Sequence, residues 1–214
     1  MEDGRITASR FSEAPRAHAS MTAPFVKEML DERGLRVQDC SAVCLSMGPG
    51  SYTGLRVGSS TAKGLCFGGG IPLLAVSTLD VLAAQAIEEG LPDGCEYIIP
   101  MIDARRMEVY TAVYSAEGQR LTEVNPIIVD GIGSFGTYTS VCDSQSILFI
   151  GDGVAKCEAV LAGEGRHFRQ ECPRATAMKA PALREFAAGA FRDTAYFEPF
   201  YLKDFVATVG KKLF

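Results

Sequence analysis

Apolar residues recur with a helical period through the first half of the chain. Spacings of three and four residues predict helices over residues 17–33 and 53–67, and a third after a cap at residues 77–78. Short apolar runs at 42–47 and 73–76 separate these helices and predict buried strands. Strands that alternate with helices are typical of the α/β class, which we therefore expect.

The second half opens with residues that favour strands. The runs 97–102 and 107–114 predict a hairpin around a polar turn, and residues 147–150 predict a further buried strand. Helical patterns follow over residues 154–161 and 182–192. The same class of fold is therefore predicted for both halves of the chain.

Residues 90–94, which contain two glycines and a proline, form the clearest linker. We therefore divide the chain into a first region, 1–94, and a second region, 95–214. A C-terminal segment of the second region could return to the first.

The chain opens on a hairpin-turn signal, Glu2-Asp3-Gly4, followed by a strand-like run over residues 5–11. A hairpin needs a strand before its turn, and only Met1 precedes this one. Either the turn is a frayed end, or an earlier strand is missing from this chain.

Composition and charge narrow the function classes. The chain has 47% hydrophobic and 22% charged residues, ordinary values for a globular protein, and a net charge of −5. That charge gives no basic surface for unaided nucleic-acid binding, so a role around RNA needs a partner that supplies positive charge. No apolar run approaches the roughly twenty residues of a membrane span, and the N-terminus lacks a signal-peptide pattern. We expect a soluble, cytoplasmic protein whose seven cysteines, none of them in a CxxC pair, are reduced thiols.

A glycine-rich stretch, MGPGSYTGLRVGSSTAKGL at residues 47–65, raises the question of phosphate binding. It lacks the lysine and the hydroxyl that follow the last glycine of a P-loop, and Gly54 arrives one residue late for the dinucleotide fingerprint. A packing role explains more residues, because Gly54, Gly58 and Ala62 are spaced by four and leave one helix face almost bare. The neighbour that approaches this face is either another element of the same chain or a partner chain.

Few side chains are candidates for chemistry. Asp103 and Asp152 each follow a predicted strand, and ligands collect at strand ends in α/β sheets, although aspartates also suit tight turns. Arg105 stands close to Asp103 in the polar turn. The two histidines, His18 and His167, have no second histidine four residues on, and no cluster offers the three ligands of a zinc site.

Five motifs together resemble those of the TsaB (YeaZ) family. They are GPGSYTGLRVG, the AKGL that follows it, IDARRMEVY, the GDG after a strand and the closing EPFYLKD. The resemblance spans nearly the whole chain and implies an ASKHA (actin, sugar kinase and Hsp70-like) fold with two ribonuclease-H-like subdomains, here 1–94 and 95–214. Family members begin with a β-hairpin that carries a phosphate loop. This chain starts at the turn after it, so we expect the first subdomain to be N-terminally truncated.

The resemblance also implies a function and partners. TsaB-like proteins are non-catalytic scaffolds and activators of the TsaD threonylcarbamoyltransferase, in the threonylcarbamoyladenosine (t6A) modification of ANN-decoding tRNAs. A TsaE-like ATPase joins the complex, tRNA is reached only through the complex, and the chain forms a homodimer in the absence of its partner. We expect no catalytic, metal or cofactor-binding residue in this chain, and ATP or ADP only at an interface with partners.

By the same resemblance, the partner surface lies on the first two helices. It comprises Met21, Phe25 and Met29 on the first helix and Gly54, Gly58 and Ala62 on the second. Thr22 stands where TsaD-like proteins have the second histidine of their metal motif, which excludes the metal-binding paralogue. The alternative function is that of an ASKHA-type nucleotide-binding ATPase or phosphotransferase that uses Asp103 and Asp152.

Overall fold

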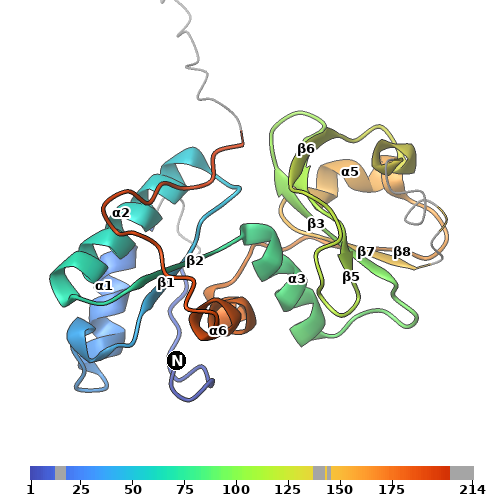
Figure 1. Ribbon diagram of the computed structural model, residues 1–214. Coiled ribbons are helices and arrows are strands. Elements are labelled where there is room, and N and C mark those ends of the chain that lie inside the picture. Colours follow the sequence, from blue (N-terminus) through green and yellow to red (C-terminus); the bar gives the residue numbers. More distant parts are fainter. Residues whose placement is uncertain (13–17, 137–142, 144–145, 203–214) are drawn as a thin grey trace, which may run out of the picture.

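Two β-sheets of unequal size organise the chain (Figure 1). The computed structural model describes residues 1–12, 18–136, 143 and 146–202. The smaller sheet pairs β1 (Val43–Ser46) with β2 (Leu73–Val76) in parallel. The strands of the larger sheet are β3 (Tyr97–Asp103), β4 (Glu108–Thr111), β5 (Tyr114–Ser115), β6 (Asn125–Ile128), β7 (Ile147–Ile150) and β8 (Arg166–Arg169).

The larger sheet mixes parallel and antiparallel pairs. Its order is β6-β4-β3-β7-β8, with β5 paired to β3. Strands β3, β7 and β8 run parallel, whereas β4 and β5 run antiparallel to β3. The β3–β4 pair confirms the predicted hairpin, and β2 and β7 have the predicted bounds. The apolar pattern does not predict β8, because its sequence, RHFR, is mostly basic. Charged residues suit an edge strand, since they discourage pairing with other chains.

Helices alternate with the strands, as the sequence pattern predicts. Within the described residues they are α1 (His18–Asp31), α2 (Tyr52–Gly69), α3 (Thr78–Glu89), α5 (Val154–Leu161) and α6 (Lys179–Ala187), with 3-10 turns η1 (Val37–Asp39), η2 (Ile132–Phe135) and η3 (Ala175–Met178). Helix α2 begins after Ser51, whose Oγ accepts a hydrogen bond from the Gly54 N–H, and stops where Gly70 adopts a φ of 63°. The mixed α/β class is therefore confirmed.

The smaller sheet is covered on both faces. Successive strand residues point to opposite faces, so Leu45 packs with Ala62 and Cys66 of α2, whereas Cys44 packs on the side of Ala177 and Met178 in η3. Helix α6 packs against β2, and α1 packs against α2 (Figure 1). The chain after β8 therefore returns to the smaller sheet.

The larger sheet is likewise enclosed between two helices. Ile98 faces α3, where it packs with Leu82, and its neighbour Ile99 faces α5, where it packs with Cys157 and Leu161. Each fully buried Ile or Leu contributes roughly 1.5–3 kcal/mol. These two apolar layers hold the second region together, and α3 joins it to the smaller sheet because α3 directly follows β2.

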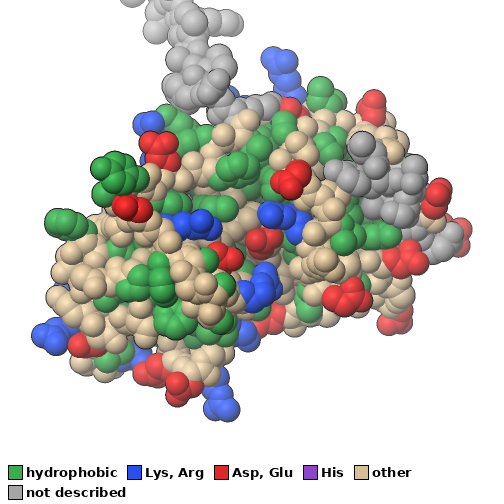
Figure 2. Space-filling model, viewed as in Figure 1, with side chains coloured by type: hydrophobic (Ala, Val, Ile, Leu, Met, Phe, Trp, Pro, Cys, Tyr) green, Lys and Arg blue, Asp and Glu red, His purple; other side chains and the backbone are tan. Residues whose placement is uncertain are grey.

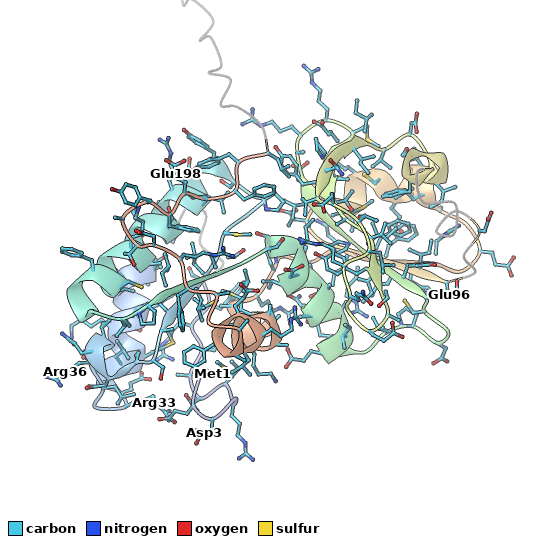
Figure 3. All side chains as sticks on the ribbon, in the orientation of Figure 1. Met1, Asp3, Arg33, Arg36, Glu96 and Glu198 are labelled. Carbon is cyan, nitrogen blue, oxygen red and sulfur yellow. The ribbon has the colours of Figure 1, made fainter. Side chains whose placement is uncertain are left out.

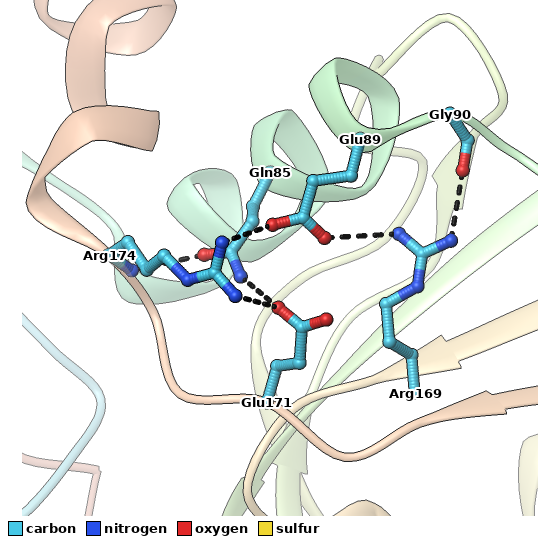
Figure 4. Close-up of polar contacts among 6 residues, drawn as sticks. All are labelled: Gln85, Glu89, Gly90, Arg169, Glu171 and Arg174. Carbon is cyan, nitrogen blue, oxygen red and sulfur yellow. Dashed lines mark hydrogen bonds and ion pairs between the residues drawn. The ribbon is translucent and has the colours of Figure 1, made fainter.

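A polar network also ties α3 to the chain that follows β8 (Figure 4). The buried Gln85 donates to Glu171 over 2.6 Å and accepts from the Arg174 N–H over 3.0 Å. The Glu89 carboxylate joins Arg174 (2.8 Å) and Arg169 (3.3 Å). Partly exposed ion pairs contribute little stability, but a buried amide left without partners costs about 1–3 kcal/mol. Gln85 is therefore the member of this network that matters most for stability.

The N-terminal residues form the predicted turn but not the predicted strand. Glu2 and Arg5 exchange both backbone hydrogen bonds, at 3.0 and 2.8 Å, and Arg33 lies beside this turn, where it donates to the Glu2 carboxylate over 2.6 Å (Figure 3). Residues 5–12 have no strand assignment, because no described strand pairs with them. The predicted strand over residues 5–11 is therefore wrong.

Two further boundaries concern the helices. Helix α6 covers residues 179–187 rather than the predicted 182–192. It ends early because Gly189 adopts a φ of 65° and turns the chain. After this turn the Arg192 N–H donates to the Leu73 carbonyl of β2 over 2.8 Å. The predicted start of the first helix at residue 17 lies outside the described residues. Within those residues, no helix combines the length and apolarity that a membrane crossing requires.

Candidate functional site

Asp103 and Asp152 meet at the carboxyl ends of the parallel neighbours β3 and β7. The Asp103 N–H donates to Asp152 Oδ1 over 2.8 Å. Two glycines make this approach possible: Gly151 has a φ of 138°, and a Cβ on it would lie 2.1 Å from the Met101 carbonyl oxygen, while a Cβ on Gly153 would lie 3.2 Å from the Asp103 nitrogen. The structure therefore brings the Asp152 carboxylate onto the backbone of Asp103, the other predicted site residue.

Lys156, on the first turn of α5, forms an ion pair with Asp103. Its Nζ donates to Asp103 Oδ1 and, over 2.6 Å, to the Glu108 carbonyl. Burial acts to raise the pKa of Asp103, but the hydrogen bond and charge of Lys156, with a hydrogen bond from the Arg105 N–H, outweigh it and lower that pKa. Burial is the main reason that the pKa of Asp152 is raised. The two carboxyls thus have pKa values displaced in opposite directions.

Lys156 is a site residue that was not predicted from the sequence, although its spacing carries a signal. Lys156 follows Asp152 by four residues at the start of a predicted helix, so it returns to the same strand end. Gln170 completes the cluster, since its Oε1 accepts from the Ala155 N–H (2.7 Å) and its Nε2 donates to the Asp152 carbonyl (3.0 Å). In the part of the chain that the structure describes, no three His, Cys, Asp or Glu side chains gather as a metal site.

Five of the cysteines in the described ranges have raised thiol pKa values. The six in the described ranges are free thiols, and Cys142 lies outside those ranges. Burial, followed by the charge of Glu185, raises the pKa of Cys44 to about 12. Burial is also the main cause of the raised pKa values of Cys66, Cys95, Cys157 and Cys172. A thiol whose pKa is raised forms less thiolate at neutral pH, so these side chains are less nucleophilic than an exposed cysteine.

The glycine-rich loop after β1 binds the chain's own backbone. The Thr78 N–H donates to the Gly48 carbonyl over 2.9 Å, and the Phe200 N–H donates to the Met47 carbonyl over 2.8 Å. Gly48 has a φ of 114°, and a Cβ on it would lie 2.8 Å from the Phe200 carbonyl oxygen. The glycine at 48 therefore permits a close protein contact.

Helix α2 divides the predicted stripe of small residues. Ala62 is only 5% exposed and packs in the core with Leu45 and Leu73, so its place in the predicted partner surface is wrong. Gly54 and Gly58 are partly exposed; a Cβ on Gly58 would meet no atom within 4 Å, and one on Gly54 only the Ser51 side chain. The split has a geometric cause, because positions eight apart on a helix are rotated by about 80° relative to each other.

The apolar residues predicted for the surface of α1 are neither fully buried nor fully exposed. Met21, Phe25 and Met29 are half-buried and lie on one side of a helix that packs against α2. Figure 2 shows hydrophobic side chains exposed on the half that contains α1 and α2, on the left. On α2 itself, Phe67 is 87% exposed and Gly64 faces solvent with no atom within 4 Å of its Cβ position. The two helices thus present an accessible surface that contains both apolar side chains and bare backbone.

Comparisons with known proteins match this chain to one family. A family model described as TsaD, tRNA N6-adenosine threonylcarbamoyltransferase, matches residues 11–209. The chain is 36% identical over 115 residues to the tRNA threonylcarbamoyladenosine biosynthesis protein TsaB of Escherichia coli (strain K12). The matched residues make up 54% of this chain and 48% of that protein. The chain is 35% identical over 127 residues to the protein of the same name from Bacillus subtilis (strain 168), and these residues make up 59% of this chain and 53% of that protein. The chain spans about half the length of the curated relatives it matches.

The fold agrees with these sequence relationships. The solved structure of YeaZ from Pseudomonas aeruginosa has a TM-score of 0.78 and 26% identity to this chain, over 94% of this chain and 92% of that one. The chain belongs to the family that the TsaD-type model describes, and its likeness to TsaB and YeaZ proteins makes it a member of the TsaB (YeaZ) family.

Proposed function

We propose that this chain acts in the biosynthesis of threonylcarbamoyladenosine in tRNA, as a non-catalytic subunit that binds and activates a TsaD-like transferase. Relatives in two bacteria carry the name of biosynthesis proteins for this modification. The chain has a net charge of −5 and therefore lacks the excess of positive charge that binding tRNA alone would need. In this proposal tRNA is bound only through the complex. A TsaE-like ATPase completes the complex, and ATP or ADP belongs to the interface with partners.

The proposal includes the division into two ribonuclease-H-like subdomains, residues 1–94 and 95–214, in an ASKHA-type arrangement. The presence of two separate sheets, each enclosed by helices, supports it. In this arrangement α1 and α2 lie together on the first subdomain, on the far side from the larger sheet (Figure 1). They are therefore available to a partner, or to a second copy of the chain.

The observation that carries the proposal is the open space at Gly58. A glycine inside a helix costs about 1 kcal/mol relative to alanine. Among the described residues nothing at Gly58 requires that cost, since a Cβ there would meet no atom of theirs within 4 Å. The close approach of another protein's backbone is a physical reason for it. Met21, Phe25 and Met29 on the adjacent helix supply the apolar part of the same surface.

The test uses size-exclusion chromatography with light scattering on a mixture of the chain and the TsaD-like transferase of the same organism. Gly58→Leu should abolish or strongly weaken a one-to-one complex, because its side chain fills the space into which the partner backbone fits. Gly64→Leu is the matched control: it introduces the same side chain into the same helix at another open position. A complex that Gly58→Leu leaves intact rules out this surface.

A second candidate is an ASKHA-type ATPase or phosphotransferase. One observation favours it, namely that Asp103 and Asp152 lie together at strand ends, where ligands collect in α/β sheets. The ion pair of Asp103 with Lys156 speaks against a free catalytic carboxylate. ATP turnover by the purified chain that Asp103→Ala abolishes would favour this enzyme over the accessory subunit.

A further inference from the structure

Two motifs from opposite parts of the sequence meet in the structure. The loop that follows β1 carries GPGSYTG, and the end of the described chain carries EPFY. Besides the hydrogen bond from Phe200 to Met47, the Tyr201 ring lies 5.2 Å from the Tyr52 ring on the first turn of α2. Glu198, two residues before Phe200, lies alongside α2 in Figure 3. The motifs therefore form one contact surface.

A lysine on α2 fixes the same segment farther along the helix. Lys63 Nζ donates to the carbonyl oxygens of Ala195 (3.0 Å) and Phe197 (3.1 Å). The Asp193 carboxylate accepts from the Ala195 N–H over 2.8 Å and so shapes the turn before it. Phe197 then packs against the core cluster that contains Leu45. Backbone, charge and apolar contacts thus all hold this segment to α2.

Helix α2 needs such support because it brings little apolar bulk of its own to the sheet. Its buried residues are Ser59, Ala62 and Cys66, all small. Small side chains bury little area, and the glycines of α2 lower its intrinsic helicity. Phe197 therefore supplies a large apolar side chain to a layer in which the helix has none fully buried.

We propose that residues 193–201 form a clasp that locks α2 onto the smaller sheet and holds the loop of residues 47–51 in shape. The glycine-rich loop then binds a C-terminal segment of the same chain. Since α2 carries the surface assigned to the partner, the clasp also sets the position of that surface, a consequence that rests on the proposed function.

Hydrogen exchange followed by mass spectrometry, on the chain alone, tests the clasp. Phe197→Ala and Lys63→Met should each speed exchange in peptides that cover residues 47–52 and 194–201, by about tenfold or more for Phe197→Ala, because removal of these contacts lets the segment open locally. Peptides from β3 and β7 should keep their protection, which shows that the variants are folded. Lys63→Met retains the aliphatic stem, so it removes the two hydrogen bonds with little change in packing.

Tyr196→Ala is the matched control, because Tyr196 belongs to the same segment but is 84% exposed. It should leave exchange unchanged. Unchanged exchange at residues 47–52 in both Phe197→Ala and Lys63→Met, or equal acceleration by Tyr196→Ala, would overturn the clasp.

A second measurement concerns the partner. If the clasp positions α2, Phe197→Ala should weaken the complex with the TsaD-like transferase at least about tenfold, although Phe197 is not part of the proposed surface. Loss of the clasp in exchange with an unchanged complex would overturn this link and leave the clasp itself standing. A wild-type chain that forms no complex would instead refute the proposed function, while the exchange result still decides the clasp.

Discussion

The glycines after β7, Gly151 and Gly153, and two glycines of α2, Gly54 and Gly58, differ in how closely other atoms surround them. Gly151 and Gly153 lie against the backbone of β3: a Cβ on Gly151 would overlap the Met101 carbonyl oxygen at 2.1 Å, and a Cβ on Gly153 would make a tight contact with the Asp103 nitrogen at 3.2 Å. Gly54 and Gly58 face mostly open space, and a side chain there would fit. At position 151 the fold requires glycine, whereas at positions 54 and 58 of α2 no contact with the described residues requires it.

This difference shows why a glycine motif cannot be assigned a role from spacing alone. The GDG after β7 allows the Asp152 carboxylate to reach the backbone of Asp103, and it is the contact with β3 that makes Gly151 necessary. The stripe on α2 has a regular spacing, yet its last member, Ala62, is buried in the core. What each small residue does is decided by the atoms next to it.

The strongest test of the comparison is Gly151→Ala. Its Cβ would lie 2.1 Å from the Met101 carbonyl oxygen at a φ of 138°, so we expect a loss of several kcal/mol or failure to fold. Thermal unfolding followed by circular dichroism checks this. A stable, folded Gly151→Ala protein would show that β3 and β7 are not packed as described.

Ala62→Leu should give the next largest effect. The added atoms enter the cluster that contains Leu45 and Leu73, and overpacking of that kind costs typically about 1–3 kcal/mol. Urea unfolding measures the change in the free energy of unfolding. A neutral result would place Ala62 on the surface after all and restore the predicted three-residue face.

Gly58→Ala should change stability in the opposite direction. Alanine fits the open space and favours the helix, so the free energy of unfolding should rise by about 0.5–1 kcal/mol. For a chain of this size that corresponds to an increase in Tm of about 1–4 °C. Gly64→Ala, at a second open position, should behave alike, and a decrease in both would contradict the open surroundings of these glycines.

The smallest effect is expected at Asp103. Its folded pKa lies below that of the unfolded chain, about 3.9, so its ionised form stabilises the fold above that pH and this contribution is lost as the pH falls through the folded value. Asp103→Asn should therefore lower stability at pH 7, by less than about 1 kcal/mol because the carboxylate is half exposed, and the difference should shrink as the pH falls below about 3.9.

Asp152→Asn is the control for this pH dependence. The pKa of Asp152 is raised, so its ionisation opposes folding as the pH rises through the unfolded value, and its neutralisation should favour the fold at pH 7. Urea unfolding at pH 7 and pH 3 separates the two variants. Equal shifts of the same sign in both would contradict the opposite pKa displacements of the pair.

The sequence by itself determined the local elements. The α/β class, the β3–β4 hairpin and the bounds of β2, β7 and α5 follow from apolar runs, periodicity and caps, because these depend on residues close together in the chain. The same local patterns predict that Asp103 and Asp152 follow strands, where a polar site can form. Family membership also came from the sequence, through motifs that the comparisons confirm.

Only the tertiary structure decided which surfaces these elements expose. It placed Lys156 on Asp103, buried Ala62 while leaving Gly58 open, and brought Phe200 onto the glycine loop from the far end of the chain. It also supplied β8, whose polar sequence becomes a strand because β7 offers a free edge. Each of these outcomes depends on a neighbour distant in sequence, and periodicity and turn signals carry no information about such neighbours.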